Sequence, residues 1–172
     1  DVIVTSTTDA LCFGDANGAV DISVSGGTPI YTYLWSTTDG SGLVVDAEDQ
    51  SGLTAGTYVV QITDTNSCIT SQTVIIEGPQ SVLIATITDE LDILCFGDAT
   101  GSATVTVEGG TNGYTYSWNT IPEQTTSTAT ELTAGTYIVT VTDANGCNTS
   151  AEVIISEPNS PLSSTITSQV DV

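Results

Sequence analysis

The side chains in this sequence that could do chemistry are four cysteines and a group of acidic and amide residues. Cys12 and Cys68 lie in the first half of the chain, and Cys95 and Cys147 lie in the second. Sequence alone leaves the connectivity open, but one bridge inside each half, Cys12–Cys68 and Cys95–Cys147, is the simplest pairing. Disulfides persist in oxidising compartments, so these pairs indicate an extracytoplasmic protein. A cysteine metal site is the weaker alternative, because the sequence has neither CxxC spacing nor His.

Asp and Asn side chains close to the cysteines are candidate calcium ligands, because Ca²⁺ takes oxygen ligands from Asp, Asn and backbone carbonyls. The candidates are Asp15, Asn17, Asp64 and Asn66 in the first half and Asp98, Asp143 and Asn145 in the second. With the simplest disulfides, both loops of one half meet at the same end, and Asp15 converges on Asp64 as Asp98 does on Asp143. Asx-Gly segments also form turns without any metal, so plain turns are the competing interpretation.

A second set of carboxylates flanks the passage between the two halves and gives a further calcium hypothesis. These junction candidates are Glu77, Asp89, Glu90 and Asp92. The last stretch of the chain has Ser168 and Gln169 where Asp89 and Glu90 would recur, which weakens this hypothesis. Calcium is the one cofactor that the sequence suggests, and nothing in the sequence requires it.

The overall composition excludes several classes of function. The 172 residues include 21 acidic side chains and no Lys, Arg or His, which gives a net charge of −21. Without His there is no Ser-His-Asp or Cys-His catalysis, and without Lys there is no Schiff base or P-loop, so we expect no enzyme. Nothing can neutralise phosphates, so nucleic acid is not an expected partner. Anionic membranes would repel the chain, and no apolar run approaches the roughly 20 residues of a membrane span.

Internal repetition organises the whole chain. The sequence LCFGDA at 11–16 returns at 94–99, and LTAGTY at 53–58 returns at 132–137. The stretch from Pro158 onward resembles the stretch from Pro79 onward, so we expect an excerpt of a longer tandem array. The expected domains are 1–79 for the first repeat, 80–160 for the second and 161–172 for the start of a third.

Each repeat shows the pattern of short β-strands. Apolar residues alternate with Thr at 103–107 and 137–141, an aromatic run occupies 114–118, and Asp143 to Gly146 is a hairpin turn before a strand at 148–155. No helical periodicity of useful length is present. About seven strands in about 80 residues predict an all-β protein of tandem immunoglobulin-like or fibronectin III-like β-sandwiches.

Repeat-equivalent aromatic residues fit the core of such sandwiches. Trp35 and Trp118 stand where these folds place a buried Trp on the third strand, and Tyr58 and Tyr137 resemble a tyrosine corner. A sugar-stacking platform is the minority interpretation of these aromatics. Phe13 and Phe96, beside the cysteine loops, are the pair most open to a binding role.

The combined motifs resemble the SprB repeat. The resemblance is carried by CFGDA at 95–99, GGT with YTYSW at 109–118, LTAGTY at 132–137, VTDANGC at 141–147 and Glu157-Pro158, with Thr65 and Ser67 as departures in the first copy. It covers nearly the whole chain twice. It implies a giant, repetitive surface protein of Bacteroidetes-type bacteria, exported by type IX secretion, a class that includes a gliding-motility adhesin. The family's repeats are regarded as stalk or filament, with no catalytic residue.

Two classes of function remain after this comparison. The first is a structural stalk or filament module of an extracellular surface adhesin, involved in adhesion or gliding and located on the bacterial cell surface. The second is a multivalent module in which each repeat weakly grips carbohydrate or another surface. A self-assembling filament subunit is a third interpretation. The expected partners are neighbouring repeats of the same chain, surface polysaccharide or other copies of the chain.

Overall fold

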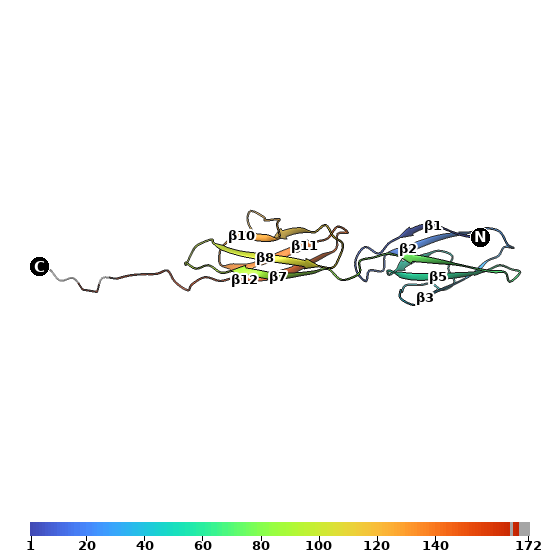
Figure 1. Ribbon diagram of the computed structural model, residues 1–172, viewed down its shortest axis with the longest axis horizontal. Coiled ribbons are helices and arrows are strands. Elements are labelled where there is room, and N and C mark those ends of the chain that lie inside the picture. Colours follow the sequence, from blue (N-terminus) through green and yellow to red (C-terminus); the bar gives the residue numbers. More distant parts are fainter. Residues whose placement is uncertain (166, 169–172) are drawn as a thin grey trace. The chain divides into compact units, whose positions relative to one another are not determined.

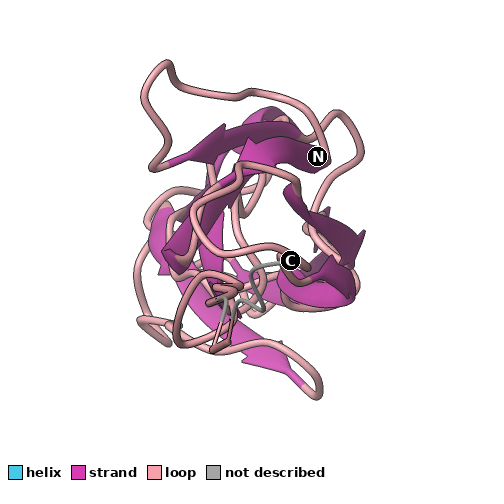
Figure 2. Ribbon diagram, turned by 90° about the vertical axis from the view of Figure 1, so that its left-hand side faces the viewer, coloured by secondary structure: helices cyan, strands magenta, loops and turns pink. Residues whose placement is uncertain are grey.

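The computed structural model describes residues 1–165, 167 and 168, and within them it contains twelve β-strands and no helix (Figures 1 and 2). The first repeat contains β1 (Val2–Thr8), β2 (Gly18–Val24), β3 (Thr32–Thr37), β4 (Gln50–Leu53), β5 (Gly56–Thr63) and β6 (Ile69–Ile76). The second contains β7 (Ile84–Leu91), β8 (Gly101–Glu108), β9 (Thr115–Trp118), β10 (Thr128–Leu132), β11 (Gly135–Thr142) and β12 (Asn148–Ile155). With no helix there, no described residue belongs to a helix that could cross a membrane.

Each repeat folds into two three-stranded sheets. In the first repeat the strand orders are β1-β2-β4 and β3-β5-β6, and in the second they are β7-β8-β10 and β9-β11-β12. All pairings within these sheets are antiparallel. Two such sheets around one core are a β-sandwich, which confirms the predicted all-β, immunoglobulin-like class. Six strands per repeat replace the predicted seven.

The chain divides into two compact units, each containing one hydrophobic core. The first unit consists of residues 1–83, 109–112 and 143–147, and the second of residues 84–108, 113–142 and the described residues from 148 onward. The predicted start of a third repeat at 161–172 falls partly outside the described residues, and the described part has no strand.

Alternation along the strands explains the cores. In β5, Tyr58, Val60 and Ile62 are buried while Gln61 is exposed, as period-2 geometry requires. Trp35 on β3 and Trp118 on β9 are buried at equivalent positions. Each indole N–H donates to a backbone carbonyl, Trp35 to Ala47 at 2.8 Å and Trp118 to Thr126 at 2.9 Å. The cores therefore bury large aromatic rings without leaving their polar atoms unpaired.

The tyrosine corner predicted from LTAGTY is present in both repeats. Tyr58 is buried, and its hydroxyl donates to the carbonyl of Thr54 at 2.7 Å while accepting from the N–H of Ser41 at 3.1 Å. Tyr137 donates to the carbonyl of Thr133 at 3.0 Å but is only partly buried. The corner therefore ties the start of the β5 and β11 strands to the chain four residues upstream.

Candidate functional site

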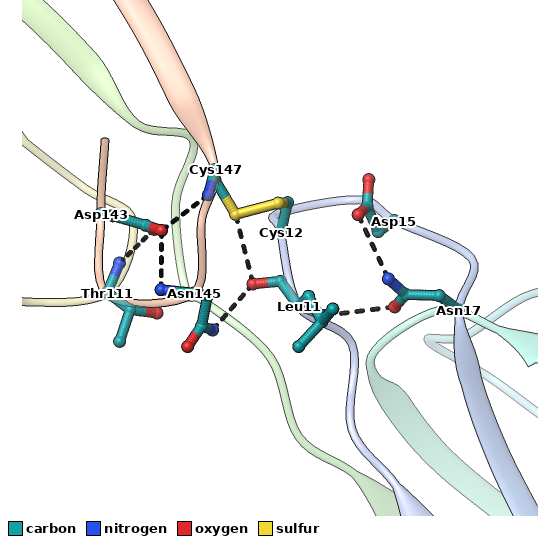
Figure 3. The surroundings of a disulfide bond; sticks show 8 residues. All are labelled: Leu11, Cys12, Asp15, Asn17, Thr111, Asp143, Asn145 and Cys147. Atoms are coloured by element: carbon teal, nitrogen blue, oxygen red, sulfur yellow. Dashed lines mark hydrogen bonds between the residues drawn. A yellow bond between two sulfur atoms is a disulfide. The ribbon is translucent and has the colours of Figure 1, made fainter. Parts of the chain in front are cut away.

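A disulfide joins Cys12 of the first repeat to Cys147 of the second, with Cα atoms 5.8 Å apart and 135 residues between them (Figure 3). Both residues belong to the first compact unit. Cys12 lies in the loop before β2, and Cys147 lies in the hairpin between β11 and β12. Cys68 and Cys95 are free and exposed. The predicted pairs, Cys12–Cys68 and Cys95–Cys147, are therefore wrong.

Strand direction explains why a bridge inside one repeat cannot form. The Ala10 N–H donates to the carbonyl of Glu77 at 2.8 Å, so the Cys12 loop lies beside the end of β6. Cys68 directly precedes the beginning of β6, a strand of 8 residues. At about 3.3 Å per residue, the two cysteines lie roughly 25 Å apart, whereas a disulfide needs Cα atoms within about 7 Å. The same holds for Cys95, since Ile93 N–H bonds Ser156 beyond the end of β12.

The hairpin that carries Cys147 is built around the carboxylate of Asp143. One oxygen accepts the backbone N–H groups of Asn145 and Cys147, both at 2.9 Å, and the other accepts that of Thr111 at 2.8 Å (Figure 3). The Asp143 side chain is only 5% exposed. Burial by itself raises its pKa, but the hydrogen bonds from Thr111, Cys147 and Asn145 outweigh this and lower the pKa below the usual value. Asp143 is therefore an anionic turn cap that holds Cys147 in position.

Asp64 makes the same cap in the hairpin of the first repeat. Its carboxylate accepts the backbone N–H groups of Thr28 at 2.9 Å, Asn66 at 2.9 Å and Cys68 at 2.8 Å. The Thr28 and Cys68 hydrogen bonds, against a smaller effect of burial, lower its pKa. Cys68 thus has the same local support as Cys147, although it has no disulfide partner in the chain.

The loop around Cys12 is braced from inside by its own amide and carboxylate groups. Asn17 accepts the N–H of Leu11 at 3.1 Å and donates to Asp15 at 3.4 Å (Figure 3). The carbonyl of Leu11 in turn accepts the side-chain amide of Asn145 at 2.9 Å. The Cys12 loop is therefore connected to the Cys147 hairpin by a hydrogen bond as well as by the disulfide.

The predicted calcium ligands are distributed differently from the expectation. Asp15 lies with the Asp143 hairpin rather than with Asp64, because Cys12 bonds Cys147. The oxygens of Asp64 and Asp143 that the calcium hypothesis needs already accept backbone N–H groups. Asp98 is exposed in the loop after Cys95. Within the described residues, no group of three or more acidic or cysteine side chains has the arrangement of a metal site.

The junction carboxylates divide into one cap and three exposed side chains. Asp92 accepts the N–H of Ser156 at 2.7 Å, as Asp9 accepts that of Glu77 at 2.9 Å in the first repeat. Glu77, Asp89 and Glu90 are exposed. Sequence reasoning missed Asp9, although it stands two residues before the LCFGDA motif in the position that Asp92 holds before the second copy.

The exposed aromatics are Phe13 and Phe96, at 54% and 46% exposure. Phe13 lines a hollow of about 330 Å³ together with Asp39, Gly56 and Pro79. These are the aromatic side chains that the sequence left open to a binding role.

Fold and site together define a class of protein: tandem immunoglobulin-like sandwiches whose polar and sulfur chemistry serves to fix loops. Two segments of the chain, residues 4–40 and 87–122, match the SprB repeat, which confirms the resemblance drawn from the motifs. None of the proteins of curated function matches the chain.

Several solved structures are similar in fold. One contains the three N-terminal domains of the highly immunogenic outer capsid protein Hoc of bacteriophage RB49, with 22% identity and a TM-score of 0.49 over 91% of this chain and 59% of that one. Another is a C-terminal fragment of intimin in complex with the intimin-binding domain of its receptor Tir, with 16% identity and a TM-score of 0.46 over 92% of this chain and 64% of that one. This chain thus spans about three fifths of those two. A third is DIP-gamma IG1+IG2, with 15% identity and a TM-score of 0.41 over 91% and 97% of the two chains.

Proposed function

We propose that the chain is a structural stalk or filament module of a large, repetitive extracellular adhesin on a bacterial surface. The two SprB repeat matches support a surface-protein repeat of adhesin type. The net charge of −21 supports an extended array, because like charges repel one another and suppress self-association until salt screens them. A role in adhesion or in gliding follows from the SprB resemblance and belongs to the proposal, as do type IX export and the surface location.

The observation that carries this proposal is the commitment of the hairpin carboxylates and the corner tyrosines to structure in both repeats. Asp64 and Asp143 cap equivalent hairpins, and Tyr58 and Tyr137 close equivalent corners. A repeated unit whose polar groups serve its own loops is suited to carrying load and spacing rather than to turning over a substrate. We therefore propose a non-enzymatic module.

The test uses the native protein in a bacterium that carries it. Removing one repeat in frame, residues 80–158, should shorten the surface fibres seen by electron microscopy and leave attachment of cells per fibre unchanged. Antibodies against the chain should label the fibres along their length. Loss of attachment with fibres of unchanged length would contradict a stalk.

A second candidate is weak, multivalent binding of surface polysaccharide, favoured by the exposed Phe13 and Phe96 at equivalent positions. An aromatic ring beside a hollow can stack on a sugar, and many weak contacts add up along an array. Phe13→Ala with Phe96→Ala would then abolish retention on a polysaccharide column. Under the stalk proposal, the parent chain is not retained in the first place.

A further inference from the structure

The two free cysteines are the repeat equivalents of the two that are bonded. Cys95 stands 83 residues after Cys12 in the same LCFGDA motif, and Cys68 stands 79 residues before Cys147 in the same hairpin. The structure therefore contains one complete first-loop-to-hairpin disulfide, one unpaired first-loop cysteine and one unpaired hairpin cysteine. The two unpaired cysteines are therefore one of each kind that the observed disulfide joins.

The local geometry at both free cysteines matches that of the bonded pair. Asp64 holds the Cys68 N–H at 2.8 Å, as Asp143 holds that of Cys147 at 2.9 Å. The carbonyl of Cys95 accepts the N–H of Asp98 at 3.2 Å, as Cys12 accepts that of Asp15 at 3.0 Å. Both free cysteines are exposed.

One amide shows how the hairpin differs with and without a partner. Asn145 donates its side-chain amide to the Leu11 carbonyl at 2.9 Å across the disulfide (Figure 3). The equivalent Asn66 donates instead to the Thr28 hydroxyl of its own repeat, at 2.8 Å. Leu94, the equivalent of Leu11, is 83% exposed, whereas Leu11 is 50% exposed. Asn66 beside Cys68 and Leu94 beside Cys95 are thus the equivalents of a polar and an apolar residue that flank the bonded cysteines.

A cavity beside Cys68 gives a further indication of the partner. It has about 180 Å³ and is lined by Asp1, Gly27, Ile62, Asp64 and Cys68, among others. That volume exceeds the roughly 150 Å³ that accommodates a benzene molecule in an engineered cavity. An apolar side chain the size of leucine therefore fits beside the thiol.

The second repeat identifies the side chain that belongs in this cavity. A Cβ atom built on Gly110 would lie 3.0 Å from Leu83, which is buried in the linker before β7. At the equivalent Gly27, the three nearest atoms all belong to Asp64. Leu162 stands 79 residues after Leu83 and is fully exposed. The linker leucine thus packs beside the hairpin of the second repeat, whereas the cavity beside Cys68 is lined by Asp1, directly before which the equivalent linker position would fall.

We propose that Cys68 and Cys95 are the open ends of a head-to-tail disulfide ladder whose partner is another copy of this repeat. The first-loop cysteine of one repeat bonds the hairpin cysteine of the next, and the linker leucine fills the cavity beside that hairpin. The segment that leads to Leu162 begins beside the Cys95 loop, since the Gly97 N–H donates to the Glu157 carboxylate at 2.7 Å. The ladder rests on the repeat array of the proposed stalk and adds a covalent bond across each step. Each bond forms by thiol–disulfide exchange, in which a small disulfide takes the two electrons and two protons and leaves as two thiols.

The test mixes two variants of this chain, each of which retains one of the two free cysteines. Cys68→Ser retains Cys95, and Cys95→Ser retains Cys68; one of them is uniformly labelled with ¹⁵N so that intact mass separates the possible dimers. After incubation at high concentration in a glutathione redox buffer, we expect the mixed dimer to dominate. Cleavage after Glu places the two cysteines in peptides 91–108 and 49–77, which should be found linked.

A matched pair of substitutions tests the leucine. Leu162→Asp in the chain that retains Cys95 should reduce the mixed dimer about tenfold, because it removes a buried apolar side chain from the contact. Ile121→Asp, at another fully exposed aliphatic residue, should leave the yield unchanged.

Three results would overturn the ladder. They are dimers in statistical proportions, Cys68 bonded to Cys95 within one parent chain, or glutathione-capped monomers alone. None of these results affects the fibre length measured in cells. The ladder can therefore fail while the stalk proposal stands, and the stalk proposal can fail while the ladder stands.

Discussion

Replacing Asp143 by Asn should destabilise the second hairpin far more than the loss of one surface charge would. The carboxylate accepts three backbone N–H groups, two on one oxygen and one on the other. In Asn the first oxygen can remain an acceptor, but the amide NH₂ then faces the N–H of Thr111. One charge-assisted hydrogen bond is lost, and the other two become neutral.

The magnitude follows from these bonds. A hydrogen bond to a charged group contributes about 1.5–3 kcal/mol, and a neutral one about half as much. Losing one bond and halving two therefore costs about 3–6 kcal/mol of unfolding free energy. For a domain of this size that corresponds to a drop in Tm of roughly 12 °C or more.

Urea unfolding of the oxidised chain, followed by tryptophan fluorescence, measures the effect. A Trp35→Phe background leaves Trp118 as the reporter of the second core, since the chain has two tryptophans. Asp98→Asn is the matched control, because Asp98 is exposed and its replacement changes the net charge equally.

The pH dependence provides a second readout. The pKa of Asp143 is lowered in the folded state, so its stabilisation is present above the unfolded value near 4 and is lost as pH falls through the folded pKa. The difference in unfolding free energy between the parent and the Asp143→Asn chain should therefore have its full size at pH 6 and become smaller below about pH 4. Equal stability of the Asp143→Asn and Asp98→Asn chains at neutral pH, or a gap independent of pH, would refute the role of the cap.

Three further predictions follow from the fold. Tyr58→Phe should cost about 1–2 kcal/mol in urea unfolding, because it removes the hydrogen bonds that the buried Tyr58 hydroxyl makes with Thr54 and Ser41, and should cost more than the same change at the half-buried Tyr137; equal costs would contradict this. Tyr33 should ionise near pH 12 in an ultraviolet titration, since burial and the nearby Glu48 raise its pKa to about 12, whereas titration near 10 would place it in solvent. Millimolar calcium should raise Tm no more than an equal ionic strength of sodium, because the hairpin carboxylates already hold N–H groups; a calcium-specific rise would restore the ligand hypothesis.

Repetition and alternation made the fold predictable from the sequence. The turn residues Asp143 to Gly146 and the alternating strands around Val139 and Val105 mark their elements by local chemistry alone, and the structure agrees. The twofold recurrence of Trp and Tyr at equivalent positions identified the core, because repeated large apolar residues in short strands have to be buried together.

The disulfide pairing was not predictable in the same way, because it depends on strand parity. Strands β3 and β4 run in the same direction. The antiparallel pairs β3–β5 and β2–β4 fix the directions of these strands, and residues 38–49 carry the chain back between them. That returning segment is not a strand of either sheet, so strands counted from the alternation pattern miss its reversal of direction. The additional reversal places Cys68 at the opposite end of the sandwich from Cys12.

The acidic loops were read by residue type, and residue type does not distinguish a metal ligand from a turn cap. Asp64 and Asp143 have the composition of calcium loops, yet their oxygens accept N–H groups from their own hairpins. The distinction depends on which backbone groups face the carboxylate, and this is known only when strands distant in sequence, such as those flanking Thr28, are placed.

The most direct test of the account is the disulfide connectivity of the oxidised chain. Free thiols are alkylated at acidic pH, and the protein is cut after Glu, which places each cysteine in its own peptide: 1–48, 49–77, 91–108 and 132–152. Mass spectrometry without reduction should then find 1–48 linked to 132–152, with the other two peptides alkylated. A link between 1–48 and 49–77 would mean that each repeat closes on itself, and would contradict both the site and the ladder.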